Sequence, residues 1–137
     1  MREIKFRVWD IKKKIMYYFG DKECPDFMSL NGKIVYSDDN HRPDFCESER
    51  YILLQYIGPL DKNEKEIYEG DIIKRDDIER DLTISEGEKC RCEVIFKDGM
   101  FTVKDSGGDN LYDVLRASDK LEGEVIGNIY ENKDLLK

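Results

Sequence analysis

Apolar and polar side chains alternate over the first residues of the chain, and this period of two predicts a β-strand. The apolar residues at 4, 6 and 8 share one face, so we expect a half-buried strand. Trp9 falls on the otherwise polar face, which we therefore expect to be covered near its end. A second β-prone run spans 15–19, and the polar stretch 10–14 between the two runs predicts a hairpin with a loop of about five residues.

The most apolar run of the chain is 51–57, which is short and rich in aromatic and branched residues. This pattern predicts a central strand that is buried on both faces, and we expect Gly58 and Pro59 to end it. Further along the chain, Gly70 separates two apolar pairs. A glycine in this position predicts a bend or bulge at which a small barrel turns a corner.

Asp98 and Gly99 give the strongest local prediction, because this dipeptide favours a two-residue turn of the primed type between antiparallel strands. Such a turn fixes the register, pairing residue 97 with 100, 96 with 101, 95 with 102 and 94 with 103. The apolar residues at 92, 94, 96, 101 and 103 then share one face. Turn chemistry and hydrophobic pattern therefore predict the same hairpin independently.

The remaining elements are short. A final strand is predicted over 124–130 with an interruption at Gly127, and a terminal helical turn over 134–136. The pattern also predicts a short helix over 109–115 and a long loop or protruding hairpin over 76–88. Strands at short intervals with one or two short helices predict a mainly β protein.

A length of 137 residues fits a single domain. Within it, we expect residues 51–137 to form a small SH3-like β-barrel and residues 1–50 to add N-terminal strands or a small subdomain. A hydrophobic content of 39% excludes a disordered chain. No apolar run approaches the roughly 20 residues that cross a bilayer, and no secretory signal is present, so we expect a cytoplasmic protein without a membrane partner.

The charge of the chain is unevenly distributed. The net charge is -8, which argues against general binding to a phosphate backbone. However, residues 1–20 carry +4, and the remainder therefore carries -12. The mixed signs along the acidic part favour a solvated surface. The alternative is that the basic end of one copy meets an acidic patch of a second copy.

The four cysteines predict reduced thiols, because the chain has no export signal. A zinc site is the alternative, but it usually needs two closely spaced ligand pairs. The only close pair, at 90 and 92, lacks the spacing of a Cys-x-x-Cys motif. We therefore expect ordinary buried or half-buried thiols and no metal or cofactor. The zinc alternative would draw on Cys24, His41, Cys46, Cys90 and Cys92.

Three blocks of sequence resemble the YopX family, which comprises small proteins of bacteriophages and prophages. The opening block is REIKFRVWD at 2–10 with KIMY at 14–17. The middle block is LQYIG at 54–58, DKN at 61–63 and EIYEGDII at 66–73, and the closing block is EVIGNIYEN at 124–132. The chain departs from the family pattern at two turns, where Glu64 stands for a frequent glycine and Lys133 for a frequent proline.

The resemblance implies a mostly β fold, a phage or prophage origin and action in the bacterial cytoplasm, but no biochemical activity. Within the motifs, Glu69 and Asp71 could be carboxylates for metal binding or acid–base chemistry, but a turn entering a strand is the favoured explanation. Trp9 and Tyr68 belong to a set of aromatic residues that could stack on single-stranded nucleic acid or form a core. Three lysines at 12–14 could contact phosphate or simply aid solubility.

We expect no enzymatic activity, because the chain has one histidine, no Gly-rich phosphate loop and no nucleophile–base pattern. A hydrolase whose catalytic groups are carboxylates alone is the remaining enzymatic alternative. The favoured function is a non-enzymatic binding or assembly module that acts through protein–protein contacts, as a homo-oligomer or with a host or phage protein. The alternative is a small β-barrel that binds nucleic acid, or an acidic mimic of DNA. The expected interaction surface comprises Trp9, Lys12, Lys13, Lys14, Tyr68, Glu69 and Asp71.

Overall fold

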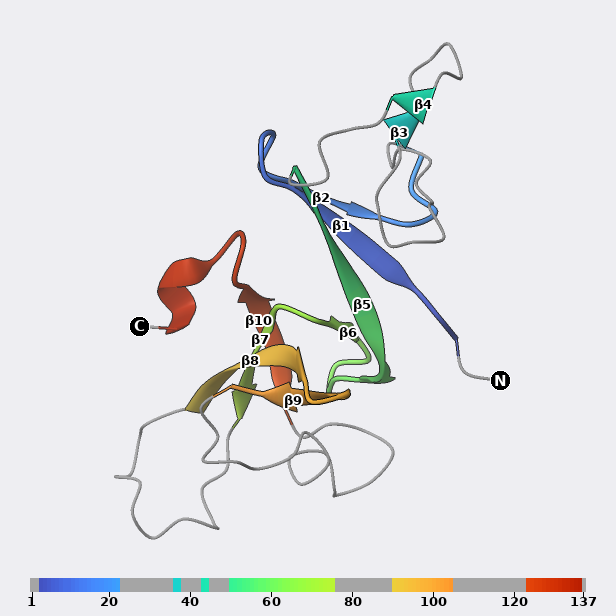
Figure 1. Cartoon of the computed structure of the whole chain (residues 1–137). Coiled ribbons are helices and arrows are strands. Elements are labelled where there is room, and N and C mark those ends of the chain that lie inside the picture. Colours follow the sequence, from blue (N-terminus) through green and yellow to red (C-terminus); the bar gives the residue numbers. More distant parts are fainter. Residues whose placement is uncertain are drawn as a thin grey trace, which may run out of the picture. The chain divides into compact units, whose positions relative to one another are not determined.

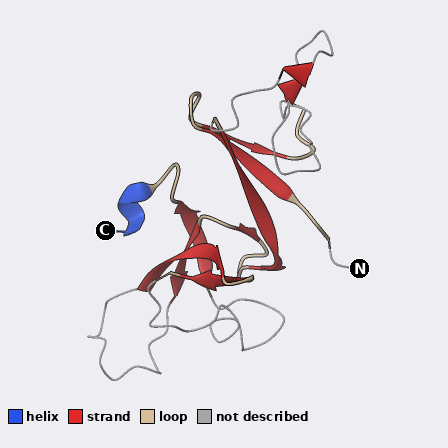
Figure 2. Cartoon of the chain, viewed as in Figure 1, coloured by secondary structure: helices blue, strands red, loops and turns tan. Residues whose placement is uncertain are grey.

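A computed structural model of the chain describes residues 3–22, 36–37, 43–44, 50–75, 90–104 and 123–136. Within these ranges the ordered elements are antiparallel strands and one short 3-10 helix, η1 (Lys133–Leu136) (Figure 2). The mainly β fold and the terminal helical turn are thus confirmed. The predicted helix over 109–115 and the predicted loop over 76–88 lie outside the described residues.

The chain divides into two compact units. Residues 4–55 form one, here called the N-terminal unit, and residues 1–3 with 56–137 form the other, the C-terminal unit. Strand β5 (Tyr51–Leu60) runs across this division (Figure 1). Its first half pairs with β1 (Phe6–Asp10) in the N-terminal unit, and its second half pairs with β6 (Glu66–Tyr68) in the C-terminal unit.

The N-terminal unit is built on the predicted hairpin of β1 and β2 (Ile15–Tyr18), whose connecting loop has the four residues 11–14. Strand β1 lies between β2 and β5. The expectation of a half-buried strand is wrong for β1, because both of its faces are buried from Arg7 to Asp10. The burial of Trp9 on the polar face confirms that this face is covered. Strands β3 (Tyr36–Ser37) and β4 (Pro43–Asp44) pair separately.

The C-terminal unit contains a second antiparallel sheet in the order β10-β7-β8-β9, which curls into a half-barrel (Figure 1). Its strands are β7 (Asp71–Arg75), β8 (Cys90–Lys97), β9 (Met100–Val103) and β10 (Glu124–Asn128). Apolar side chains from these strands and from β5 and β6 form one buried cluster. The cluster contains Ile57, Ile67, Ile73, Cys92, Val94, Val103 and Val125.

The predicted hairpin of β8 and β9 is confirmed residue by residue, with 94 opposite 103, 95 opposite 102, 96 opposite 101 and 97 opposite 100. Asp98 and Gly99 have φ angles of 52° and 82°, and a turn of type I′ requires a positive φ at both positions. The rings of Phe96 and Phe101 meet edge to face, with their centres 5.0 Å apart. Local turn chemistry therefore suffices to place this hairpin.

Three strand predictions need correction. Gly58 and Pro59 do not end β5, since the strand continues to Leu60 and absorbs Gly58, at a φ of 111°, as a shift of register against β6. Strand β5 is also not buried on both faces, because Leu53 is exposed. Strand β10 ends two residues before the predicted end at residue 130, because the side chain of Asn128 accepts hydrogen bonds from the amides of Tyr130 and Glu131 and turns the chain.

The predicted bend at Gly70 is confirmed, with a φ of 82° between β6 and β7.

Candidate functional site

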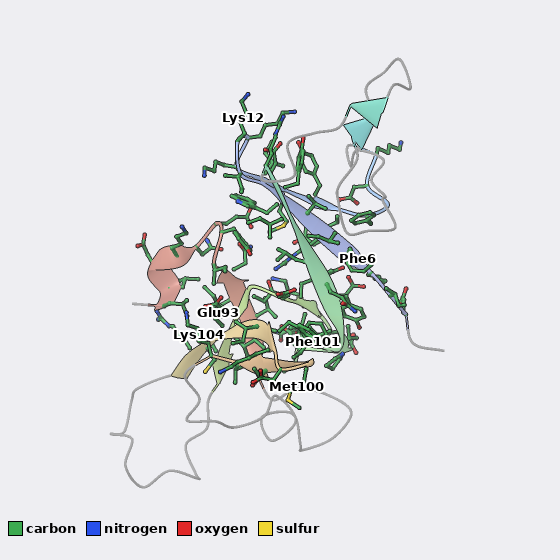
Figure 3. The ribbon with its side chains drawn as sticks, viewed as in Figure 1. Phe6, Lys12, Glu93, Met100, Phe101 and Lys104 are labelled. Carbon is green, nitrogen blue, oxygen red and sulfur yellow. The ribbon has the colours of Figure 1, made fainter. Side chains whose placement is uncertain are left out.

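The loop between β1 and β2, here called the lysine loop (residues 11–14), presents Lys12, Lys13 and Lys14 to solvent. The buried carboxylate of Asp10 holds this loop through its backbone. Its Oδ1 atom accepts hydrogen bonds from the amides of Lys12 and Lys13, each at 2.9 Å. The amide of Lys14 donates to the Asp10 carbonyl at 2.8 Å. Figure 3 shows the Lys12 side chain at the tip of the hairpin, directed away from the ribbon.

Arg50 fixes the same carboxylate from a distant part of the sequence. Its Nη2 and Nε atoms donate to the two oxygens of Asp10 at 2.8 and 3.1 Å. The Arg50 carbonyl accepts the amide of Ile11 at 2.9 Å, and the guanidinium lies 4.9 Å from the centre of the Tyr51 ring. Burial raises the pKa of Asp10, but the hydrogen bonds from Arg50, Lys13 and Lys12 outweigh it, so this pKa lies below its ordinary value of 3.8. Asp10 is therefore a charged anchor at neutral pH.

These contacts determine what the lysine loop can bind. A loop that recognises phosphate through its backbone needs free amide groups. Here the amides of Ile11, Lys12, Lys13 and Lys14 all donate to acceptors within the protein. The loop therefore offers only its three ammonium groups, which act as point charges on an anchored backbone.

Beside the lysine loop, the sheet of the N-terminal unit presents apolar side chains on one side. Residues directly opposite one another in antiparallel strands point to the same side. Tyr17 and Leu53 both lie opposite Val8, and Ile15 lies opposite Asp10. The Phe6 and Phe19 rings meet at 6.1 Å, edge to face. We call this surface the apolar face; its members are Phe6, Ile15, Tyr17, Phe19 and Leu53.

Three members of the apolar face are exposed, although Val8, which lies on the same side between Tyr17 and Leu53, is fully buried. The exposed fractions are 44% for Ile15, 38% for Leu53 and 37% for Phe19. Exposed apolar groups scattered singly are ordinary, but a contiguous set beside charged residues is typical of a protein interface. The apolar face and the lysine loop together are the candidate interaction surface of the N-terminal unit.

The C-terminal unit exposes two apolar side chains beside the turn between β8 and β9, and they point to opposite sides of the hairpin. Phe96 is 53% exposed and Met100 is 47% exposed. Figure 3 shows Met100 at the end of β9, extending away from the strand, and Phe101 farther along it. At the base of the hairpin, Glu93 and Lys104 form an ion pair at 3.7 Å.

The carboxylates of the middle motif stabilise turns. Asp61 is fully buried, and its Oδ1 atom accepts the amides of Asn63 at 2.8 Å and Lys65 at 2.9 Å. Its Oδ2 atom accepts the amide of Val125 in β10 at 2.9 Å. Buried Asp71 likewise accepts the amide of Tyr68 at 2.8 Å, across the bend at Gly70. These hydrogen bonds give both side chains a folding role within the C-terminal unit.

The structure divides the predicted interaction surface between the two units. Lys12, Lys13 and Lys14 are exposed in the N-terminal unit, where Trp9 is buried. Tyr68, Glu69 and Asp71 belong to the C-terminal unit. Tyr68 is buried against the Tyr56 ring, 5.6 Å away, and its hydroxyl donates to Glu66 at 2.7 Å, while Glu69 is half-buried in the turn.

Sequence reasoning missed the apolar face. The run 15–19 indicated a strand, and its alternate residues Ile15, Tyr17 and Phe19 could have been assigned to one face in the same way as residues 4–8. Nothing local indicated that Leu53 joins them. The role of Arg50 was also missed, because its partner Asp10 lies 40 residues earlier.

Within the described ranges, no group of three or more His, Cys, Asp or Glu side chains is arranged to hold a metal ion. Cys92 is a free, buried thiol, in agreement with the prediction for this residue, whereas the side chains of the other three cysteines are outside the described set. In the part of the chain that the structure describes, no helix combines the length and apolar character that a membrane span requires.

Comparisons with known proteins extend over the whole chain. A family model with the description YopX protein matches residues 5–137. Among solved structures, the chain is similar to the crystal structure of protein EF1440 from Enterococcus faecalis, with a TM-score of 0.58 and 27% sequence identity over 100% of both chains. No match was found among curated proteins. Neither matching name states an activity.

Proposed function

The chain belongs to the YopX family, and we propose that it is a non-enzymatic binding or assembly module that acts through protein–protein contacts. The observation that supports this function best is the exposed apolar face next to the lysine loop. Burial of exposed apolar side chains against a partner stabilises the complex by about 25 cal/mol per Å² of apolar surface removed from water. The neighbouring ammonium groups favour a partner with carboxylates at the edge of its contact surface.

The proposal includes the absence of catalysis. Its support is that Asp71, one of the two carboxylates with a predicted chemical role, is buried and accepts the Tyr68 amide, while the other, Glu69, is half-buried in the same turn. A general acid or base must instead reach the reacting group of a substrate within hydrogen-bonding distance. The finer parts of the proposal are a closed SH3-like barrel, a homo-oligomeric assembly or a host or phage partner, and action in the cytoplasm of a bacterium.

The direct test is a pull-down with the purified full chain from lysates of prophage-induced cells, with and without nuclease. We expect a protein that is retained after nuclease treatment and lost with the double variant Ile15→Thr, Leu53→Thr. Threonine is used because it favours strands while removing apolar surface. The matched control is Leu136→Thr, which changes a residue of similar exposure (40%) in η1 and should retain the partner.

Two results would contradict this function. One is capture that survives the double variant, and the other is capture that nuclease abolishes. Circular dichroism of each variant must first show an unchanged strand signal, so that a lost partner is not confused with a lost fold.

Nucleic-acid binding is the second candidate, supported by the three exposed lysines on the anchored lysine loop. Since only ammonium groups are available there, the affinity for a short single strand should fall steeply with salt, with a log–log slope of roughly -2 for three neutralised phosphates. Fluorescence anisotropy with a labelled oligonucleotide measures this slope, and Lys12→Gln, Lys13→Gln should reduce it. An acidic mimic of DNA would instead bind a DNA-binding protein and ignore the oligonucleotide.

A further inference from the structure

The end of the hairpin of β1 and β2 combines positive charge with exposed aliphatic side chains. All five residues from 11 to 15 are exposed, and Figure 3 shows Lys12 directed away from the ribbon. The three lysines lie in the middle of this segment, between Ile11, which is 37% exposed, and Ile15, which is 44% exposed. We call residues 11–15 the basic tip. It presents three ammonium groups flanked by two aliphatic side chains.

The adjacent carboxylate does not cancel the positive charge of the basic tip. Asp10 is 1% exposed and forms an ion pair with Arg50 at 2.8 Å, so its charge is already balanced. Residues 11–15 contain no acidic side chain, and their local charge is therefore +3 although the chain carries -8. Charges farther away than about 8 Å are largely screened at physiological ionic strength. The net charge of the chain thus does not describe the attraction that the basic tip exerts on a nearby anion.

The backbone of the basic tip is fixed, and its amides are already used. Ile11 donates to the Arg50 carbonyl, Lys12 and Lys13 donate to the Asp10 carboxylate, and Lys14 donates to the Asp10 carbonyl. Such a tip does not surround one oxygen atom of a ligand with amides. Its lysines act as separate point charges on long side chains. This arrangement suits a surface on which negative charge is spread over many mobile groups.

From these observations we infer that the basic tip binds the surface of an anionic phospholipid bilayer. The ammonium groups lie among the phosphates, while the lysine methylene groups and the two isoleucines lie at the boundary between headgroups and acyl chains. Each lysine near such a surface strengthens binding by roughly fivefold, so the contact is weak and reversible. The inference goes beyond the proposed function, because it does not require the rest of the apolar face.

The expectation of no membrane partner concerned segments that cross a bilayer. Attachment to the surface needs no such segment, since a few basic and apolar side chains at one projecting site provide the contact. A bilayer also accepts a projecting tip without a matching cavity, because its headgroups rearrange around the inserted side chains.

The aliphatic side chains of the basic tip favour lipid over nucleic acid. Proteins that bind single strands without sequence preference stack bases on aromatic side chains, and residues 11–15 contain no aromatic residue. Ile11 and Ile15 offer no flat ring to a base, but both lose contact with water when they enter the headgroup region. A bilayer therefore uses both features of the basic tip, whereas a phosphate backbone uses only the charge.

Flotation of the purified full chain with lipid vesicles tests the inference. One set of vesicles contains phosphatidylcholine alone, and the other contains about one third phosphatidylglycerol. We expect binding to the anionic vesicles only, with a partition coefficient that falls as salt shortens the Debye length. Lys12→Gln, Lys13→Gln should lower this coefficient by more than about tenfold. Ile11→Ser, which keeps the amide that donates to Arg50, should lower it by about threefold.

Two controls separate the basic tip from other surfaces. Lys65→Gln, Lys133→Gln makes the same change in net charge on exposed positions of the C-terminal unit and should leave vesicle binding unchanged. Leu53→Thr alters the apolar face outside the basic tip and should also leave it unchanged. Circular dichroism of each variant must show an unchanged strand signal before its binding is compared.

Four results would overturn the inference. They are no binding to anionic vesicles at low salt, equal binding to both kinds of vesicle, equal weakening by the two lysine pairs, and loss of binding with Leu53→Thr. A labelled oligonucleotide that binds through Lys12 and Lys13 while anionic vesicles do not bind would assign the basic tip to nucleic acid instead. If vesicle binding fails but the pull-down still retains a protein through Ile15 and Leu53, the proposed function stands and only this inference is wrong.

Discussion

The two hairpins of the molecule reach their turns by different physical means. The turn between β8 and β9 depends on two residues, Asp98 and Gly99, which adopt positive φ angles themselves. The loop between β1 and β2 depends on the buried carboxylate of Asp10 and on Arg50, a residue 40 positions away. The first hairpin is specified locally, whereas the second needs the rest of its unit. Both hairpins were predicted from the sequence, but only for the first was the register predicted residue by residue.

The largest effect should come from Asp10→Ala. This change removes the acceptor of two loop amides and the partner of Arg50, so we expect a loss of roughly 3 kcal/mol in the free energy of unfolding. Urea denaturation followed by circular dichroism measures it. The matched change in the other hairpin, Asp98→Asn, preserves the turn preference and should alter stability by less than about 0.5 kcal/mol. Equal losses in the free energy of unfolding for the two changes would contradict the proposed difference between the hairpins.

A smaller effect is expected from Gly99→Ala. A Cβ atom at this position meets no atom within 4 Å, so only the positive φ of 82° opposes the change. The expected loss is about 1 kcal/mol, measured by the same denaturation. Gly70→Ala is an informative comparison, because there a Cβ would also approach the Tyr130 ring to 2.9 Å and the loss should be greater. A larger loss at Gly99 than at Gly70 would be inconsistent with this account.

Acid should weaken the distant anchor at Asp10. The pKa of Asp10 is lower in the folded protein than its ordinary value of 3.8, so the carboxylate contributes its full stabilisation above that value. The contribution disappears as the pH falls through the folded-state pKa. The stability difference between the parent protein and Asp10→Asn should therefore shrink below about pH 4, as thermal unfolding at a series of pH values would show. A difference that grows in acid would mean that the sign of the shift is wrong.

The smallest effect should follow from Lys12→Gln, Lys13→Gln. Asp10 binds the amides of these residues and not their ammonium groups, so stability should change by less than about 0.5 kcal/mol. Thermal unfolding checks this result. A marked loss would show that the side chains help to form the lysine loop, and the loop would then be less suited to presenting them to a partner.

The sequence allowed prediction wherever a feature depends on neighbouring residues. The register of β8 and β9 followed from a dipeptide, and the bend at Gly70 followed from one glycine between apolar pairs. The prediction that Gly58 ends β5 was wrong for a physical reason. A glycine with positive φ can either end a strand or be accommodated within it as a bulge. Which of the two occurs depends on the pairing with β6, which lies beyond the local pattern.

The same limit applies to the candidate site. Lys12, Lys13 and Lys14 were correctly placed at an exposed hairpin tip, because a polar stretch between β-prone runs is a local signal. The apolar face was not predicted, because it needs the registers that bring Leu53 beside β1 and β2. The carboxylates of the middle motif invited a chemical interpretation. The burial of Asp71, its bond to the Tyr68 amide and the half-burial of Glu69 became evident only when the turn around them was in place.

Strand β5 has a consequence for how such proteins can exchange parts by recombination. A boundary between structural units usually falls in a loop, where a crossover between two related genes leaves each unit whole. Here the boundary between residues 55 and 56 falls within one continuous strand. A crossover at this point would join half a strand from each parent. Inheritance of either unit alone is thus restricted to parents whose β5 sequences pair with both β1 and β6.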